Sequence, residues 1–241
     1  MELIYLYHSG FALAGSGFTL VFDYFEDSEG PDSGILHSEL LQRDGRFYVL
    51  ASHFHADHFS REVLKWREQR PDIVYLFSKD ILRRRRAGKD EAIFLKKGDT
   101  YADECLAVRA FGSTDVGVSF LVEVGGKKIF HAGDLNNWHW MDESSEAEWR
   151  GYEKNFLHEL ADLRSYTSGL DLAMFPVDPR LGREYMRGAR QFVEQVKTAV
   201  FVPMHFDEAY AEAAAFRSVA EANGGKMIVL ARRGQRELLF E

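Results

Sequence analysis

A chain of 241 residues, of which 46% are hydrophobic, is long enough to bury a substantial core as one large domain or two small ones. Its 30 basic and 38 acidic residues give a net charge of −8, which argues against nucleic acid as the main partner. The single cysteine, Cys105, excludes an internal disulfide and favours a cytoplasmic protein. No apolar run reaches the ~20 residues of a membrane span, and the first residues lack the pattern of a secretion signal. We therefore expect a soluble protein that is not exported.

Strands dominate the first half of the predicted secondary structure. These segments are rich in Ile, Val, Tyr and Phe: residues 2–13, 17–25, 45–52, 72–78, 92–101 and 105–113. A turn at residues 14–17 separates the first two, and Gly125-Gly126 is the turn of a hairpin over residues 118–134. Between the strands we expect a helix that Ser60 caps and that stops before Pro71, and a short helix over residues 79–88.

The second half is predicted to alternate helices with strands. An amphipathic helix is indicated by apolar residues at steps of three and four: Trp149, Tyr152, Phe156, Leu160 and Leu163. The following elements are a strand over 170–178, a helix around 186–196, a strand over 198–206, a helix over 207–225, and strands over 226–233 and 236–241. The sequence shows no internal repeat, low-complexity tract or linker, so we expect one domain over residues 1–241.

The segment SHFHADHF, residues 52–59, places four metal-seeking side chains directly after a predicted buried strand. His53 and His55 are two positions apart and project to the same side of an extended segment. Asp57 keeps that phase, and His58 follows where the chain should turn into the next helix. Imidazole nitrogens and carboxylate oxygens together suit zinc, manganese or iron. The segment therefore predicts a metal site.

This motif, His53-x-His55-x-Asp57-His58, resembles the HxHxDH signature of the metallo-β-lactamase superfamily. Two later segments, KKIFHAGDLN with Asp134 and AVFVPMHFDE with His205, resemble the other ligand-bearing strand ends of that family. The resemblance covers nearly the whole chain. It implies an α/β fold, a four-layer αβ/βα sandwich in which helices flank two mixed sheets.

The same resemblance implies one or two divalent metal ions, with zinc as the first choice and manganese or iron as alternatives. The implied ligands are His53 and His55 for the first metal, Asp57, His58 and His205 for the second, and Asp134 as the bridge.

One residue of the family pattern is missing. Ser113 stands where the resemblance would place a further histidine for the first metal. Asp115, two residues later, is either an oxygen ligand or the cap of the turn GSTDVG, and both interpretations remain open. An oxygen-richer first site would shift the preference from zinc towards manganese.

Three more residues are predicted near the metals. The segment YLYHSGFAL resembles the opening of the branch that includes ascorbate-6-phosphate lactonase and N-acylphosphatidylethanolamine phospholipase D. His8 lies there at a strand end, either beside the metals or as a structural histidine. Asp23 is expected to orient a ligand imidazole. His139 is expected on a loop over the site, where it would contact metal or substrate.

The resemblance implies a metal-dependent hydrolase, in which a metal-activated hydroxide attacks and Asp57 orients it or transfers its proton. The expected partner is a small-molecule substrate: an ester or lactone first, including a phosphorylated sugar lactone, and a phosphodiester second. A metal-binding protein with an incomplete site and little turnover, and a di-iron oxidoreductase, remain open alternatives. The run Arg83–Arg86 is either a solvated face or a grip for phosphate or RNA.

Overall fold

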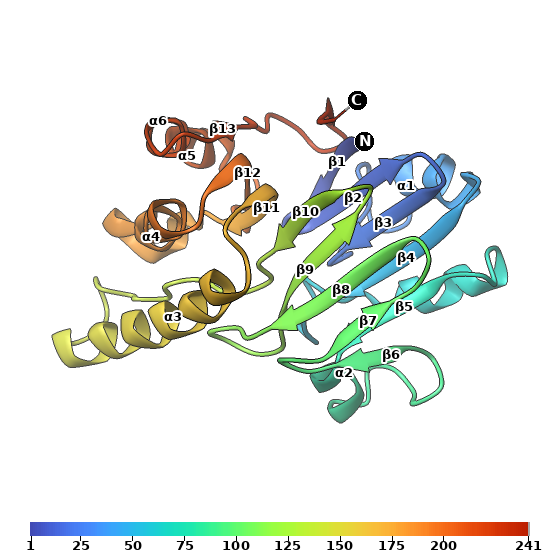
Figure 1. Cartoon of the computed structure of the whole chain (residues 1–241), viewed down its shortest axis with the longest axis horizontal. Coiled ribbons are helices and arrows are strands. Elements are labelled where there is room, and N and C mark those ends of the chain that lie inside the picture. Colours follow the sequence, from blue (N-terminus) through green and yellow to red (C-terminus); the bar gives the residue numbers. More distant parts are fainter. Residues whose placement is uncertain (241) are drawn as a thin grey trace. The chain divides into compact units, whose positions relative to one another are not determined.

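Two seven-stranded mixed sheets form the framework of the chain in its computed structural model, which describes residues 1–240 (Figure 1). By their internal contacts, the residues divide into two compact units, each containing one sheet. The first unit comprises residues 1–96 and the C-terminal segment from Ala231, and the second comprises residues 97–230. The expectation of a single domain stays a prediction. Among the described residues, no helix is both long and apolar enough to cross a membrane.

The sheet of the first unit has the strand order β14-β1-β2-β3-β4-β5-β6. The pairs from β14 to β3 are antiparallel, and those from β3 to β6 are parallel. The strand bounds are β1 Glu2–Tyr7, β2 Gly10–Gly15, β3 Phe18–Phe22, β4 Arg46–Ala51, β5 Val74–Ser78, β6 Ile93–Leu95 and β14 Arg236–Leu238. Every residue of β2 and β3 is buried, and all of β4 after Arg46 is buried too. These continuous apolar runs are typical of a sheet covered on both faces.

Short helices connect the strands of the first unit. They are α1 Ile35–Ser38, η1 Leu40–Gln42, η2 Arg61–Glu68 and α2 Lys79–Arg83. Their apolar side chains join those of the sheet in one cluster, which includes Leu36, Trp66 and Ile81. Burial of this cluster is the main force that holds the helices to the sheet.

The second unit repeats this pattern with the strand order β13-β12-β11-β10-β9-β8-β7. The pairs from β7 to β10 are antiparallel, and those from β10 to β13 are parallel. The strand bounds are β7 Thr100–Ala102, β8 Leu106–Phe111, β9 Ser119–Val124, β10 Lys127–His131, β11 Leu170–Pro176, β12 Thr198–Met204 and β13 Lys226–Met227. The helices are α3 Glu146–Tyr166, η3 Pro179–Glu184, α4 Arg187–Gln195, α5 Tyr210–Ala215 and α6 Arg217–Ala222. Figure 1 shows α3 as a long helix. Of the predicted apolar stripe, Phe156, Leu160 and Leu163 are buried, whereas Tyr152 is 45% exposed.

Several predicted elements divide in the structure. The strand expected over residues 2–13 turns at His8, whose φ of 55° ends β1 before β2 begins. The strand expected over 92–101 breaks into β6 and β7, with Gly98 at a φ of 91° between them. The helix expected over 207–225 breaks at Phe216, whose N–H bonds to Ala213 in a tight 3₁₀ turn.

Three other predictions need correction. Ser60 does cap the helix after the motif, accepting a hydrogen bond from Glu62 N–H, but that helix is of the 3₁₀ type and ends at Glu68. Of the strand expected over 226–233, only β13 forms. The last predicted strand, 236–241, reduces to β14, and its final residue lies outside the described part of the chain.

The repeated topology positions the candidate site residues. In each unit they follow the carboxyl ends of parallel strands: Asp23 after β3, His53 to His58 after β4, Asp134 after β10, Asp178 after β11 and His205 after β12. Open α/β sheets bind ligands at this end of their strands. The hydrogen bonds of the sheet hold each strand end in place, and so they position the backbone of these residues.

Candidate metal centre

The first unit holds its histidines in defined tautomers through a buried network around Asp23. Ser52 Oγ donates to Asp23 Oδ2 at 2.6 Å, so His53 Nδ1, 2.9 Å from the same Oγ, is the donor in that contact. The proton is therefore on His53 Nδ1, and Nε2 carries a lone pair. His55 Nδ1 lies 3.0 Å from that Nε2, close enough for both nitrogens to share one cation.

His58 is oriented by the same carboxylate. Its Nδ1 donates to Asp23 Oδ2 at 2.7 Å, and both side chains are fully buried. Asp23 is thus in contact with a motif imidazole, as expected from the sequence. A histidine that donates from Nδ1 to a carboxylate presents Nε2 as a metal ligand, which is the arrangement common in zinc sites.

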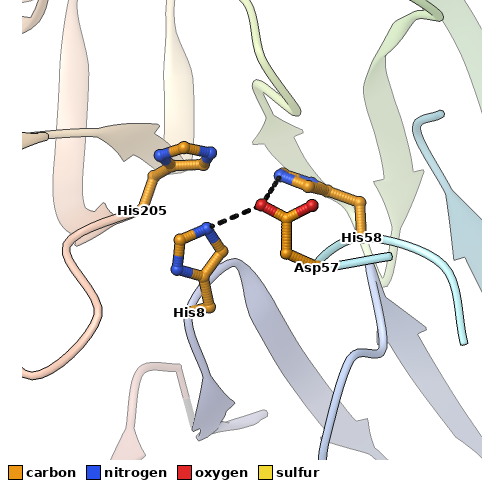
Figure 2. Close-up of side chains that lie close together, drawn as sticks. All are labelled: His8, Asp57, His58 and His205. Carbon is orange, nitrogen blue, oxygen red and sulfur yellow. Dashed lines mark ion pairs between the residues drawn. The ribbon is translucent and has the colours of Figure 1, made fainter. Parts of the chain in front are cut away.

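His8 and Asp57 lie beside His58 in the first unit (Figure 2). The carboxylate Oδ2 of Asp57 is 3.4 Å from His8 Nε2 and 3.9 Å from His58 Nε2. The His8 side chain is only 2% exposed, whereas Asp57 is 38% exposed. This arrangement brings His8 to the motif and leaves the Asp57 carboxylate accessible.

The backbone at these strand ends is strained. His8, Asp23 and His205 have positive φ values of 55°, 42° and 64°. Such a conformation costs a residue other than glycine about 1–3 kcal/mol and persists where the surrounding structure enforces it, often at functional sites. Each of the three residues directly follows the last residue of a strand, β1, β3 or β12.

The second unit contains a matching arrangement around His205. Its Nδ1 lies 3.0 Å from Asp178 Oδ2, and its Nε2 lies 3.4 Å from Asp134 Oδ1. Arg180 donates to both oxygens of Asp178, from Nε and from one terminal nitrogen. Burial raises the pKa of Asp178, but the hydrogen bonds from His205 and Arg180 outweigh burial and hold the pKa at about 2. The ionised Asp178 favours a proton on His205 Nδ1, although a terminal nitrogen of Arg180 also lies 3.0 Å from that atom, and Nε2 faces Asp134.

Asp115 and Asp134 approach each other on two loops of the second unit. Each offers a carboxylate oxygen within 4.8 Å of the other's. Thr114 joins the loops, since its hydroxyl contacts the backbone of both Asp134 and Asn136. This geometry favours an oxygen-ligand role for Asp115, next to Ser113.

His139 is the candidate that the structure places differently. The residue is fully buried, not exposed on an overhanging loop. Its Nε2 lies 3.1 Å from the Glu184 carbonyl oxygen, and its Nδ1 accepts from Met141 N–H at 3.1 Å. Burial is the main cause that lowers its pKa, so the ring is neutral and its two nitrogens hold the local backbone. A contact of His139 with metal or substrate stays a prediction that this geometry disfavours.

Two residues that contact the candidate site were not found from the sequence. Asp178 follows strand β11 in the segment FPVD, just as Asp134 follows β10, and that repeated position was the available signal. Asp80, in α2, accepts a hydrogen bond from Phe54 N–H at 3.0 Å and so supports the backbone between His53 and His55. No local pattern marks Asp80, because its partner is 26 residues away.

The donors in both units fit a divalent metal ion. Imidazole nitrogens and carboxylate oxygens face one another in each unit, as at His205 Nε2 and Asp134 Oδ1, 3.4 Å apart. Two lone pairs at such a distance repel unless a proton or a cation lies between them. Nitrogen and oxygen donors of this kind bind zinc, manganese and iron. The metal-ligand role stays a prediction for each of the six residues that the family resemblance implies: His53, His55, Asp57, His58, Asp134 and His205.

Comparison with known proteins gives the family. A model described as the beta-lactamase superfamily domain matches residues 2–149, more than half of the chain. The chain belongs to the metallo-β-lactamase superfamily, and the resemblance seen in its motif is confirmed. A UPF0173 metal-dependent hydrolase of Symbiobacterium thermophilum is 25% identical over 246 residues, covering 98% of both chains.

Solved structures support the same fold. The metallo hydrolase Igni18 from the archaeon Ignicoccus hospitalis has a TM-score of 0.71 at 18% identity, covering 100% of this chain and 99% of the other. The diiron β-hydroxylase CmlA from Streptomyces venezuelae has a TM-score of 0.65 at 15% identity, covering 98% of this chain and 53% of CmlA. These likenesses confirm the predicted fold class of two mixed sheets with flanking helices.

Proposed function

We propose that this chain is a metal-dependent hydrolase that acts on a small-molecule ester or lactone. Family membership supports the reaction class, as does the name of the relative from Symbiobacterium thermophilum. The proposed metal ligands are His53, His55, Asp57, His58, Asp134 and His205, with Asp115 as a further oxygen donor. Zinc is the first proposed metal, and manganese or iron the alternatives.

One observation carries this proposal. In each unit a buried carboxylate holds an imidazole by its Nδ1: Asp23 holds His58 at 2.7 Å, and Asp178 holds His205 at 3.0 Å. A carboxylate at Nδ1 fixes the tautomer and raises the basicity of Nε2, as metal-binding histidines require. The Nε2 atoms of His58 and His205 in turn lie 3.9 Å from Asp57 Oδ2 and 3.4 Å from Asp134 Oδ1, both of which are proposed metal ligands.

Side chains of the protein carry out the proton transfers of the proposed reaction. When bound, a divalent ion activates water and polarises the carbonyl oxygen of the substrate. Asp57 has two carboxylate oxygens, so one can serve as a ligand while the other accepts the proton of the attacking water. His8, 3.4 Å from Asp57 Oδ2, orients that carboxylate. The proton then passes from Asp57 to the leaving alkoxide.

The ester or lactone follows from the resemblance of the segment around His8 to the lactonase branch. A phosphodiester is the second candidate. A metal-binding protein with little turnover remains the competing class, because Ser113 replaces a histidine of the family pattern.

The test combines metal content with turnover. Purified protein should bind one or two equivalents of zinc or manganese and hydrolyse a lactone or p-nitrophenyl ester faster than bis(p-nitrophenyl) phosphate. Asp57→Ala should lower kcat by at least about 100-fold, because it removes the general base. Asp90→Ala removes an exposed aspartate from a turn and is the matched control.

The outcomes separate the alternatives. Turnover restricted to the phosphodiester would replace the ester assignment, and tightly bound metal without any turnover would favour the binding protein. Unchanged activity in Asp57→Ala would contradict the catalytic role. Iron as the bound metal, with an oxidation reaction in place of hydrolysis, would favour a di-iron oxidoreductase.

A further inference from the structure

We propose that a pocket beside the metal-binding motif binds an anionic group of the substrate through Arg61 and Arg86. The hydrolase would then prefer esters that carry a carboxylate or phosphate over neutral esters. This inference rests on the proposed function and specifies its substrate class.

The pocket lies wholly in the first unit and has a volume of about 350 Å³. Its lining combines aromatic and apolar side chains with two guanidinium groups: Phe25, Glu26, Pro31, Ala56, Phe59, Ser60, Arg61 and Arg86. Ala56 stands between His55 and the proposed catalytic Asp57. A group bound in this pocket would therefore lie next to the turn that carries the motif.

Arg86 is the strongest evidence for an anion. Its Nε is buried and has no hydrogen-bond acceptor among residues 1–240. A buried cationic donor without an acceptor is unfavourable by about 1–3 kcal/mol or more. An anionic group against the Arg86 guanidinium would offset this cost through its charge.

Arg61 adds a second positive charge at the first position of η2. The Arg61 side chain is exposed, and the described part of the chain provides it with no ion pair. The acidic residue of the lining does not neutralise the arginines, because Glu26 is paired with Arg233 at 2.9 Å. The pocket is therefore positive on balance although the whole chain has a net charge of −8.

The apolar part of the lining is held in place. Phe25 stacks on Tyr7 with 5.8 Å between ring centroids, and Phe59 is 1% exposed. Rigid aromatic walls bind the apolar part of a ligand with little loss of side-chain entropy. The pocket thus suits a molecule with a flat or aliphatic part and one anionic group.

The arginine run supplies only one side chain to this pocket. Arg84 lies over the Phe54 ring, 4.8 Å from its centroid, and Arg83 and Arg85 are exposed outside the lining. A continuous grip on a polyanion would need several arginines on one surface, whereas this arrangement suits a single anionic group. Arg83→Gln consequently offers a control with the same change of charge.

The test compares two esters with the same leaving group, p-nitrophenyl acetate and mono-p-nitrophenyl succinate. We expect a higher kcat/KM for the succinate ester. Arg86→Gln should lower the ratio of the two kcat/KM values by about tenfold, as the loss of one charge-assisted hydrogen bond predicts. Arg83→Gln should leave the ratio as it is in the wild type. Competition by inorganic phosphate and by succinate then shows which anion the pocket prefers.

The experiment distinguishes an error in the anion-site proposal from an error in the proposed hydrolase function. If both esters are hydrolysed and Arg86→Gln leaves their ratio unchanged, the pocket assignment is wrong and the hydrolase stands. If neither ester is hydrolysed, the result counts against the hydrolase. The anion site is then tested separately, by calorimetric measurement of succinate and phosphate binding. Binding that weakens in Arg86→Gln but not in Arg83→Gln would support the anion site. Absent or equal binding would overturn it.

Discussion

Asp178 and Asp23 show how single buried carboxylates define the candidate site. Both are fully buried, and each contacts the Nδ1 of one histidine. Asp23 was expected from the sequence because it follows an apolar strand near the first motif. Asp178 was missed although it follows its strand in the same way, and only the folded sheet brings it to His205, 27 residues later. Contacts between distant residues are the part of such a site that a single sequence does not specify.

The role of Asp178 leads to a prediction about metal affinity. Asp178→Asn keeps the size of the side chain but removes the charge that holds His205 in its tautomer. We expect the affinity for zinc, measured by competition with a chelator, to fall by about 10–100-fold. Asp171→Asn is the matched control, because Asp171 lies on β11, the strand that Asp178 follows, and pairs with Lys127 at 3.3 Å. Equal affinities in the two variants would show that Asp178 does not orient a ligand.

At the scale of elements, a histidine clamp joins α1 to η2 in the first unit. His37 Nδ1 is 2.8 Å from Asp27 Oδ2, and His37 Nε2 is 2.9 Å from Glu62 Oε1. Glu62 also accepts from Trp66 Nε1 at 2.6 Å. Since η2 begins two residues after the motif phenylalanine Phe59, the clamp supports the segment that leads away from the proposed ligands.

This clamp predicts a pH-dependent stability. Burial lowers the pKa of His37, but hydrogen bonds with Glu62 and Asp27 outweigh it, and the net pKa is raised above 6.5. The charged form is thus favoured by folding, so its contribution is complete below pH 6.5 and is lost as the pH rises through the raised pKa. His37→Gln should lower the free energy of unfolding by roughly 1 kcal/mol more at pH 5.5 than at pH 8.5.

Chemical denaturation at the two pH values measures this difference. His158→Gln, an exposed substitution on α3, is the control and should show no comparable dependence. A His37→Gln effect that is the same at both pH values would mean that the clamp is not charged in the folded protein.

The same scale shows which elements the sequence specified. The Gly125-Gly126 turn was predicted because both positions need a positive φ, and the structure has 57° and 71° there. Helix α3 was predicted because its apolar stripe is long and regular. The division at His8 was predicted only in part: the strand pattern runs over residues 2–13, whereas the family resemblance places His8 at a strand end. The division at Phe216 was missed because its alanine-rich surroundings favour one continuous helix.

At the scale of the whole molecule, the two units share one topology and each contributes donors at its strand ends. This shared topology was not visible in the sequence, which shows no internal repeat. Strand order depends on hydrogen bonding between segments, and segments of different sequence can form the same order. The central claim is that the donors of both units bind metal: His53, His55, Asp57 and His58 in the first, and Asp134 and His205 in the second. A ligand that binds only the folded state stabilises it, by about 2.7 kcal/mol at a concentration 100 times its dissociation constant.

The most direct test of this claim is the thermal unfolding of metal-stripped protein with and without added zinc. We predict that zinc raises the Tm of the wild type by several degrees, and that His53→Ala and Asp134→Asn each reduce this increase. One variant comes from each unit, so both sets of donors are tested. A wild-type Tm that does not respond to zinc, manganese or iron would contradict the account, as would a rise in both variants as large as that of the wild type.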